Sequence, residues 1–148
     1  MSLRLQIAED MKSAMRAKDA SRLAAIRLLM AAIKQREVDE RIELDDAAVI
    51  AVVDKLSKQR RDSIEQFSRA AREDLAERER FELGVLAEYL PQQASEDEIA
   101  AVIDAAVAAT GAAGPKDMGK VMGQVRGKLA GRADLARVSA AIRARLGG

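Results

Sequence analysis

Residues 114–129 read GPKDMGKVMGQVRGKL, and this stretch carries two helical patterns at once. At about 100° per residue, its apolar side chains fall on one narrow arc, as in a helix with one face in a core. These residues are Met118, Val121, Met122, Val125 and Leu129. The opposite arc carries a glycine at every fourth position, which we call the glycine row: Gly119, Gly123 and Gly127. Since Lys116, Lys120 and Arg126 flank the row, the outward face is predicted to be bare backbone between cations.

Glycines inside a helix weaken it. Each costs about 1 kcal/mol relative to alanine, so the row sacrifices roughly 3 kcal/mol, and we expect something to approach this face closely. Two interpretations are open at this point. In the first, the small residues let a second helix pack closely. In the second, the bare backbone and its cations receive a phosphate backbone through charge-assisted contacts.

Composition predicts a globular, all-α protein. The 148 residues are 49% hydrophobic and 33% charged, only 2% are aromatic, and helix-favouring residues dominate. This length suffices for one domain or two small ones. The chain has no cysteine and no histidine, which excludes disulfides and thiolate metal sites and removes the commonest general base. We therefore expect no catalytic residues, no metal and no cofactor.

The net charge of +1 hides a basic carboxy-terminal part. From residue 116 onward, eight lysines and arginines stand against two aspartates. Such a segment suits a polyanion, and a solvated basic helix face is a comparable alternative. The amino terminus lacks the pattern of a signal peptide, and charged residues bound the longest apolar run, so we expect a cytoplasmic protein without a membrane partner.

Caps and apolar spacing predict four helices in residues 1–90, as a helical bundle or hairpins. The expected helix starts are Ser2, Asp19 or Ser21, Asp45 with Asp46, and Asp74. Residues 91–94 (PQQA) are predicted to be a linker, because a proline disfavours helix at the residue before it and polar residues follow. A small three-helix domain is expected over residues 95–148, with cap and stop signals at Ser95 with Glu98, Gly111, Pro115 and Asp134.

Three segments resemble the YqeY family: residues 58–67 (KQRRDSIEQF), 89–91 (YLP) and 114–123 (GPKDMGKVMG). That family shares a helical module with the tail of the B subunit of tRNA-dependent amidotransferases, and residues 123–133 also resemble that tail. The resemblance implies a two-part helical protein whose tail contacts tRNA, while a separate catalytic unit amidates the charged amino acid. A carbon–nitrogen ligase label, with glutamine as amido-nitrogen donor, would come through the shared module by analogy.

The chain departs from the family pattern in three respects. Ala71 stands where a glycine is expected, and Leu135-Ala136 replaces an expected Gly-Lys, with Arg137 one place later. The large body in which the amidotransferase B subunit activates its substrate has no counterpart here. We therefore expect no independent amidotransferase activity.

Together these patterns predict a tRNA-binding helical adaptor that resembles the amidotransferase tail. The expected nucleic-acid-binding residues are Lys116, Gly119, Lys120, Gly123, Arg126, Gly127, Lys128 and Arg132. The expected partners are tRNA or another structured RNA, with a tRNA-dependent amidotransferase or an aminoacyl-tRNA synthetase as protein candidates. The alternative is a helical protein–protein interaction module in which the glycine row receives a partner helix and no nucleic acid binds.

Overall fold

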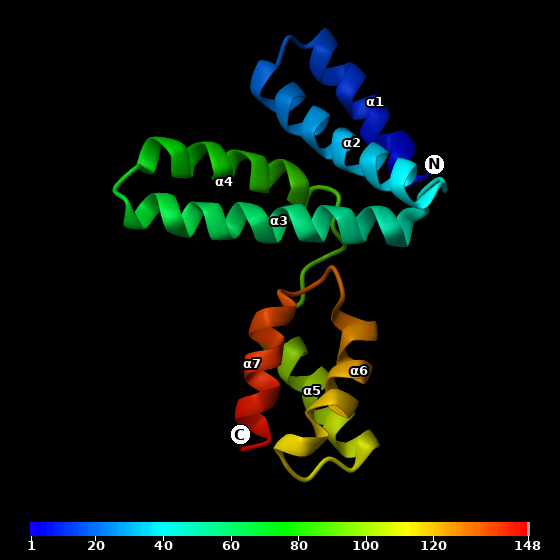
Figure 1. Ribbon diagram of the computed structural model, residues 1–148, viewed down its shortest axis with the longest axis vertical. Helices are drawn as coiled ribbons and strands as arrows, with labels where there is room; N and C mark the ends of the chain where they lie inside the picture. Colours follow the sequence, from blue (N-terminus) through cyan, green and yellow to red (C-terminus); the bar gives the residue numbers. More distant parts are fainter. Residues whose placement is uncertain (148) are drawn as a thin grey trace. The chain divides into compact units, whose positions relative to one another are not determined.

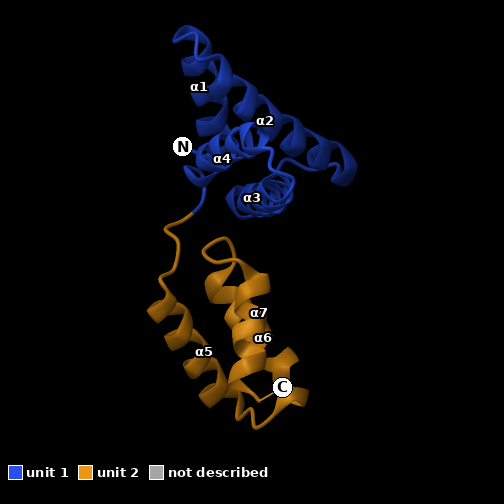
Figure 2. Ribbon diagram, turned by 90° about the vertical axis from the view of Figure 1, so that its left-hand side faces the viewer, with its two compact units in different colours: residues 1–90 blue, residues 91–148 orange. Residues whose placement is uncertain are grey.

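The computed structural model describes residues 1–147, which form seven α-helices and one 3₁₀ turn and contain no strand (Figure 1). The predicted all-α class is therefore confirmed. The chain divides after Leu90 into two compact units (Figure 2). Gly148, the last residue of the predicted second domain, lies outside the described residues.

The first unit consists of two helical hairpins, in which α1 packs against α2 and α3 packs along α4 (Figure 1). Its helices are α1 (Leu3–Arg16), α2 (Ala20–Glu40), α3 (Asp46–Arg69) and α4 (Glu73–Ala87). The first three begin as predicted, because a side-chain oxygen of the cap residue accepts a first-turn N–H at Ser2, Asp19 and Asp45. The apolar stripes meet in one core, whose most deeply buried members include Ile7, Ile26, Leu29, Val49 and Val53.

The start of α4 differs from the prediction, because Asp74 is not its cap. The residue before α4 is Arg72, whose side chain makes no capping hydrogen bond. The Asp74 carboxylate instead accepts a hydrogen bond of 3.1 Å from the Arg72 guanidinium. Between α3 and α4 the chain reverses at Ala71, whose φ of 57° lies in the left-handed region. A left-handed residue after a helix turns the chain without a polar cap.

The second unit is a three-helix module. Its elements are α5 (Glu96–Thr110), the 3₁₀ turn η1 (Pro115–Asp117), α6 (Met118–Leu129) and α7 (Leu135–Arg145). The predicted boundary residues act as expected at Ser95, Gly111 and Asp134, whereas Pro115, expected in the first turn of the glycine-row helix, begins the 3₁₀ turn that precedes α6. The segment predicted as a linker, residues 91–94, lies within this unit. All three helices contribute buried side chains to the core of the module, among them Ile103 from α5, Val125 from α6 and Ile142 from α7.

No single helix in residues 1–147 has the length and hydropathy to cross a membrane. The segments Glu96–Thr110 and Pro115–Leu129 reach those values only as a pair, and a bend of 97° separates them. The same residues contain no group of three or more acidic side chains placed to hold a metal ion.

Candidate nucleic-acid interface

The two faces of α6 differ in exposure to solvent, as the sequence predicts. Val121, Val125 and Leu129 have no exposed surface, whereas the glycine row is exposed. Beyond the adjacent residues and backbone of its own helix, a Cβ atom added to any glycine of the row would meet no atom within 4 Å. No other part of the second unit therefore packs on the row. The first interpretation is thus excluded for the other helices of the second unit, so a helix that packs on the row must come from outside this unit.

Local sequence explains why cations surround the glycines. Pro115 begins η1, where its fixed φ suits a first helical turn and its missing N–H leaves no donor unpaired. The buried positions of Val121 and Val125 then set the rotation of α6 about its own axis, because both side chains must reach the core. The positions on the opposite side of the helix are left at the surface, Lys120 and Gly123 among them.

Four cations accompany the glycine row, and all are exposed: Lys116, Lys120, Arg126 and Lys128. Within the second unit, only Lys120 of these four forms an ion pair, with 3.9 Å between its ammonium and the Asp117 carboxylate, and the charge of Lys116 also acts on that carboxylate. Since 71% of the Lys120 side chain is exposed, this long ion pair contributes little. The Asp117 carboxylate accepts the Ala113 N–H at 3.0 Å, and this bond, more than Lys120, lowers its pKa. The four cations are consequently available to an anion.

Arg132, the eighth predicted residue, is differently placed. It lies in the loop between α6 and α7, and its guanidinium donates to the Glu98 carboxylate at 2.7 Å and to the Gln92 carbonyl at 3.0 Å. The hydrogen bond from Arg132 is the main cause of a lowered pKa at Glu98. The structure thus brings seven of the predicted residues together on η1 and α6, and sets Arg132 apart with partners of its own.

A family model described as Yqey-like protein matches residues 4–146. The chain belongs to the YqeY family. Two similar curated proteins are both named Altered inheritance of mitochondria protein 41, mitochondrial. The one from Lachancea thermotolerans is 44% identical over 98 residues, which are 64% of this chain and 52% of the relative. The one from Pyrenophora tritici-repentis is 34% identical over 126 residues, which are 84% of this chain and 69% of the relative.

The names of these YqeY relatives contradict the expected cytoplasmic location, because each is called a mitochondrial protein. The expectation came from composition and from the pattern at the amino terminus. Amino-acid composition reflects the aqueous surroundings of a folded protein. The cytoplasm and the mitochondrial interior are both aqueous, so composition does not distinguish between these two compartments. This chain spans about half the length of the first curated relatives it matches.

The other two YqeY-like segments lie in the first unit except for Pro91, and polar side chains of both connect helices of that unit. Residues 58–67 belong to α3, and their Arg60 contacts Glu79 at 3.0 Å and Glu82 at 3.2 Å, both on α4. Residues 89–91 follow α4, and the first of them, Tyr89, is bonded to α1. Sequence reasoning did not identify these pairs, because no local spacing relates residues on different helices.

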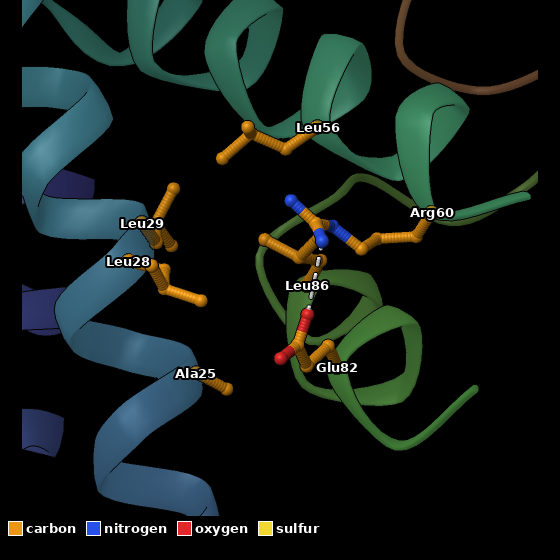
Figure 3. A pocket seen from close by; sticks show the side chains of 7 residues that line it. All are labelled: Ala25, Leu28, Leu29, Leu56, Arg60, Glu82 and Leu86. Carbon is orange, nitrogen blue, oxygen red and sulfur yellow. Dashed lines mark ion pairs between the residues drawn. The ribbon is translucent and has the colours of Figure 1, made fainter. Parts of the chain in front are cut away.

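A cavity of about 140 Å³ lies between α2, α3 and α4 of this YqeY protein (Figure 3). Its lining is mainly aliphatic, with one ion pair, and consists of Ala25, Leu28, Leu29, Leu56, Arg60, Glu82 and Leu86. Burial raises the pKa of Glu82, and Arg60 opposes that effect. Ordinary ligand sites enclose about 300 to 1,000 Å³. The cavity is smaller than these, so the glycine row is the stronger candidate for a binding site.

Proposed function

We propose that the second unit binds tRNA, or another structured RNA, through the glycine row and the cations beside it. The protein then acts as an adaptor without an amidotransferase activity of its own. One observation carries the proposal. An exposed row of helical glycines, to which no other part of the second unit comes close, is accompanied by four exposed cations, of which only Lys120 forms an ion pair within that unit.

This surface suits the backbone of a nucleic acid. Without Cβ atoms, the row lets a phosphate come near the helix, where Lys and Arg side chains neutralise it. Such contacts position a nucleic acid without reading its sequence. All three aromatic residues, Phe67, Phe81 and Tyr89, belong to the first unit, so the second has no ring on which a base could stack. This favours a structured RNA, which is recognised by shape and backbone, over a single strand held by stacking.

Membership of the YqeY family and the likeness of this module to the amidotransferase tail support tRNA among structured RNAs. A tRNA-dependent amidotransferase or an aminoacyl-tRNA synthetase would be the matching protein partner. The proposal concerns this chain's module alone, since the chain spans about half the length of the first relatives it matches.

The test combines charge removal with salt dependence. Replacing Lys120→Ala and Lys128→Ala together should weaken tRNA binding and lower the slope of log affinity against log salt by about 0.7 to 0.9 for each lost phosphate contact. The matched control is Lys55→Ala with Lys58→Ala, which removes the same charge from exposed positions of α3. The control should bind more tightly than the α6 variant. Undetectable tRNA binding by the intact protein at low salt would refute the proposed function.

A helical protein partner is the second candidate, because the same open row would accept a helix at close distance. Gly123→Leu should obstruct either ligand. The variant Lys120→Ala with Lys128→Ala distinguishes RNA from a helical partner. It should weaken binding of RNA but not of a helix, since exposed charge pairs contribute little to a helix–helix contact. A partner whose binding is lost in Gly123→Leu and kept in the lysine variant would favour this second function.

A further inference from the structure

The start of the second unit is hydrogen-bonded to the loop before α7. The Ala94 N–H donates to the Arg132 carbonyl at 2.8 Å. The Gln93 side-chain amide donates to the carbonyl of Gly131, a buried residue, at 2.9 Å. Two main-chain carbonyls of the loop before α7 thus accept hydrogen bonds from two consecutive residues, Gln93 and Ala94. These residues belong to the segment that leads into the second unit.

The Arg132 side chain adds two further hydrogen bonds, in which the loop before α7 is the donor. Its Nε donates to the Gln92 carbonyl at 3.0 Å, and its Nη2 donates to a Glu98 oxygen at 2.7 Å. One guanidinium therefore ties the chain before α5 to the first turn of α5. We call residues 92–94, Glu98 and residues 131–132 the latch.

The weakest part of the latch is its ion pair. The Arg132 side chain is 32% exposed and that of Glu98 is 50% exposed, so water and ions reach both groups. Ion pairs between such exposed groups contribute little to the stability of a protein. Glu98 accepts only one hydrogen bond from Arg132, whereas a phosphate group can accept two from one guanidinium and carries more negative charge. A bound polyanion can therefore displace Glu98 at small cost.

We propose that the latch is a switch, in which a phosphate group that takes the Arg132 guanidinium from Glu98 releases residues 92–94. The proposal rests on the proposed function, because it names RNA as the source of the phosphate. It adds that RNA binding loosens the segment through which the chain enters the second unit. Coupling of this kind is reciprocal, so a latch that is already open must bind RNA more tightly.

The test compares Glu98→Gln with Glu96→Gln. Both changes remove one negative charge from the first turn of α5, but only Glu98 is bonded to Arg132. One readout is hydrogen exchange of the Ala94 amide in the free protein, and the other is tRNA affinity at fixed salt. Relative to Glu96→Gln, we expect Glu98→Gln to exchange about two- to five-fold faster at Ala94 and to bind tRNA about two- to five-fold more tightly. In the unaltered protein, tRNA should accelerate exchange at Ala94.

Each contrary result has a distinct meaning. Equal exchange at Ala94 in the two variants would refute the latch itself, whatever tRNA does. Faster exchange with equal tRNA affinity would refute the coupling, as would protection of Ala94 by bound tRNA. Absence of tRNA binding by the unaltered protein would refute the coupling together with the proposed function, while exchange in the free variants would still decide whether the latch exists.

Discussion

The Tyr89 hydroxyl donates a hydrogen bond of 2.6 Å to the Asp10 carboxylate, and so fastens the segment after α4 to α1. The Tyr89 side chain is buried, with 3% of the residue exposed. Burial, and after it the bond to Asp10, raises the pKa of the Tyr89 hydroxyl well above its usual range. Tyr89 of the family-like segment 89–91 therefore has a structural role at the end of the first unit.

Tyr89→Phe should destabilise the protein by about 1 to 2 kcal/mol at neutral pH, because a hydrogen bond to a charged group is lost. A raised pKa in the folded state means that the hydroxyl's contribution is complete below about pH 10 and is lost as the pH rises further. Urea unfolding of the unaltered protein and of Tyr89→Phe from pH 7 to 11 should show that the difference between their free energies of unfolding becomes smaller. A gap independent of pH would contradict this assignment.

Glu37 is the centre of a second contact between distant residues. Its Oε2 accepts hydrogen bonds from the Arg4 Nε and the Leu44 N–H, both at 2.9 Å, and its side chain is only 10% exposed. The Arg4 bond first, and the Leu44 N–H next, lower the pKa of this carboxyl. The stabilising effect is therefore present above the unfolded pKa of about 4.3 and is lost as the pH falls through the folded value.

Glu37→Gln should cost about 1 to 3 kcal/mol of unfolding free energy at pH 7, and the difference from the unaltered protein should shrink in acid. The control is Glu40→Gln on the same helix, where the carboxylate is 44% exposed and pairs with Arg36 at 3.1 Å. That change should stay within about 0.5 kcal/mol. Equal losses in the two variants would argue against the Glu37 contacts as the cause.

Ala71→Gly should stabilise the protein by about 0.5 to 1 kcal/mol, because Ala71 has a φ of 57°, which glycine adopts without a steric penalty. The neighbouring change Ala70→Gly is the control, since Ala70 has a φ of −85° and gains nothing from glycine's freedom. That control should lose stability, through the greater entropy of the unfolded chain. Thermal unfolding measures the stability change in both variants. A change of the same sign in both would contradict this explanation of the Ala71 conformation.

Gly123→Ala should raise the stability of the second unit by about 1 kcal/mol. Position 123 lies inside α6, and an added Cβ meets nothing within 4 Å, so only the helix propensity changes. Gly111→Ala is the control, because its φ of 66° penalises any side chain. Calorimetry should show the two variants moving in opposite directions. A destabilised Gly123→Ala would mean that the row serves the fold of the chain.

The sequence by itself determined the helices, the side-chain caps of α1, α2, α3, α5 and α7, and the outward direction of the glycine row. These features depend on residues a few positions apart. Ser95 caps α5 through the N–H three residues later, and Val121 and Val125 turn the opposite side of α6 to solvent. A helix is a local structure, so its start and its buried face follow from neighbouring residues. The predicted cations and glycines of η1 and α6 were found together for that reason.

Only the tertiary structure decided which distant residues meet. It showed that the glycine row is open, that Arg132 is bonded to Glu98, and that Tyr89 reaches Asp10. It also placed the reversal before α4 at Ala71, where the sequence has no glycine. Helix periodicity says which face of a helix is buried but not which helix will cover it. Contacts between helices depend on how whole faces pack, and many arrangements share the same local pattern.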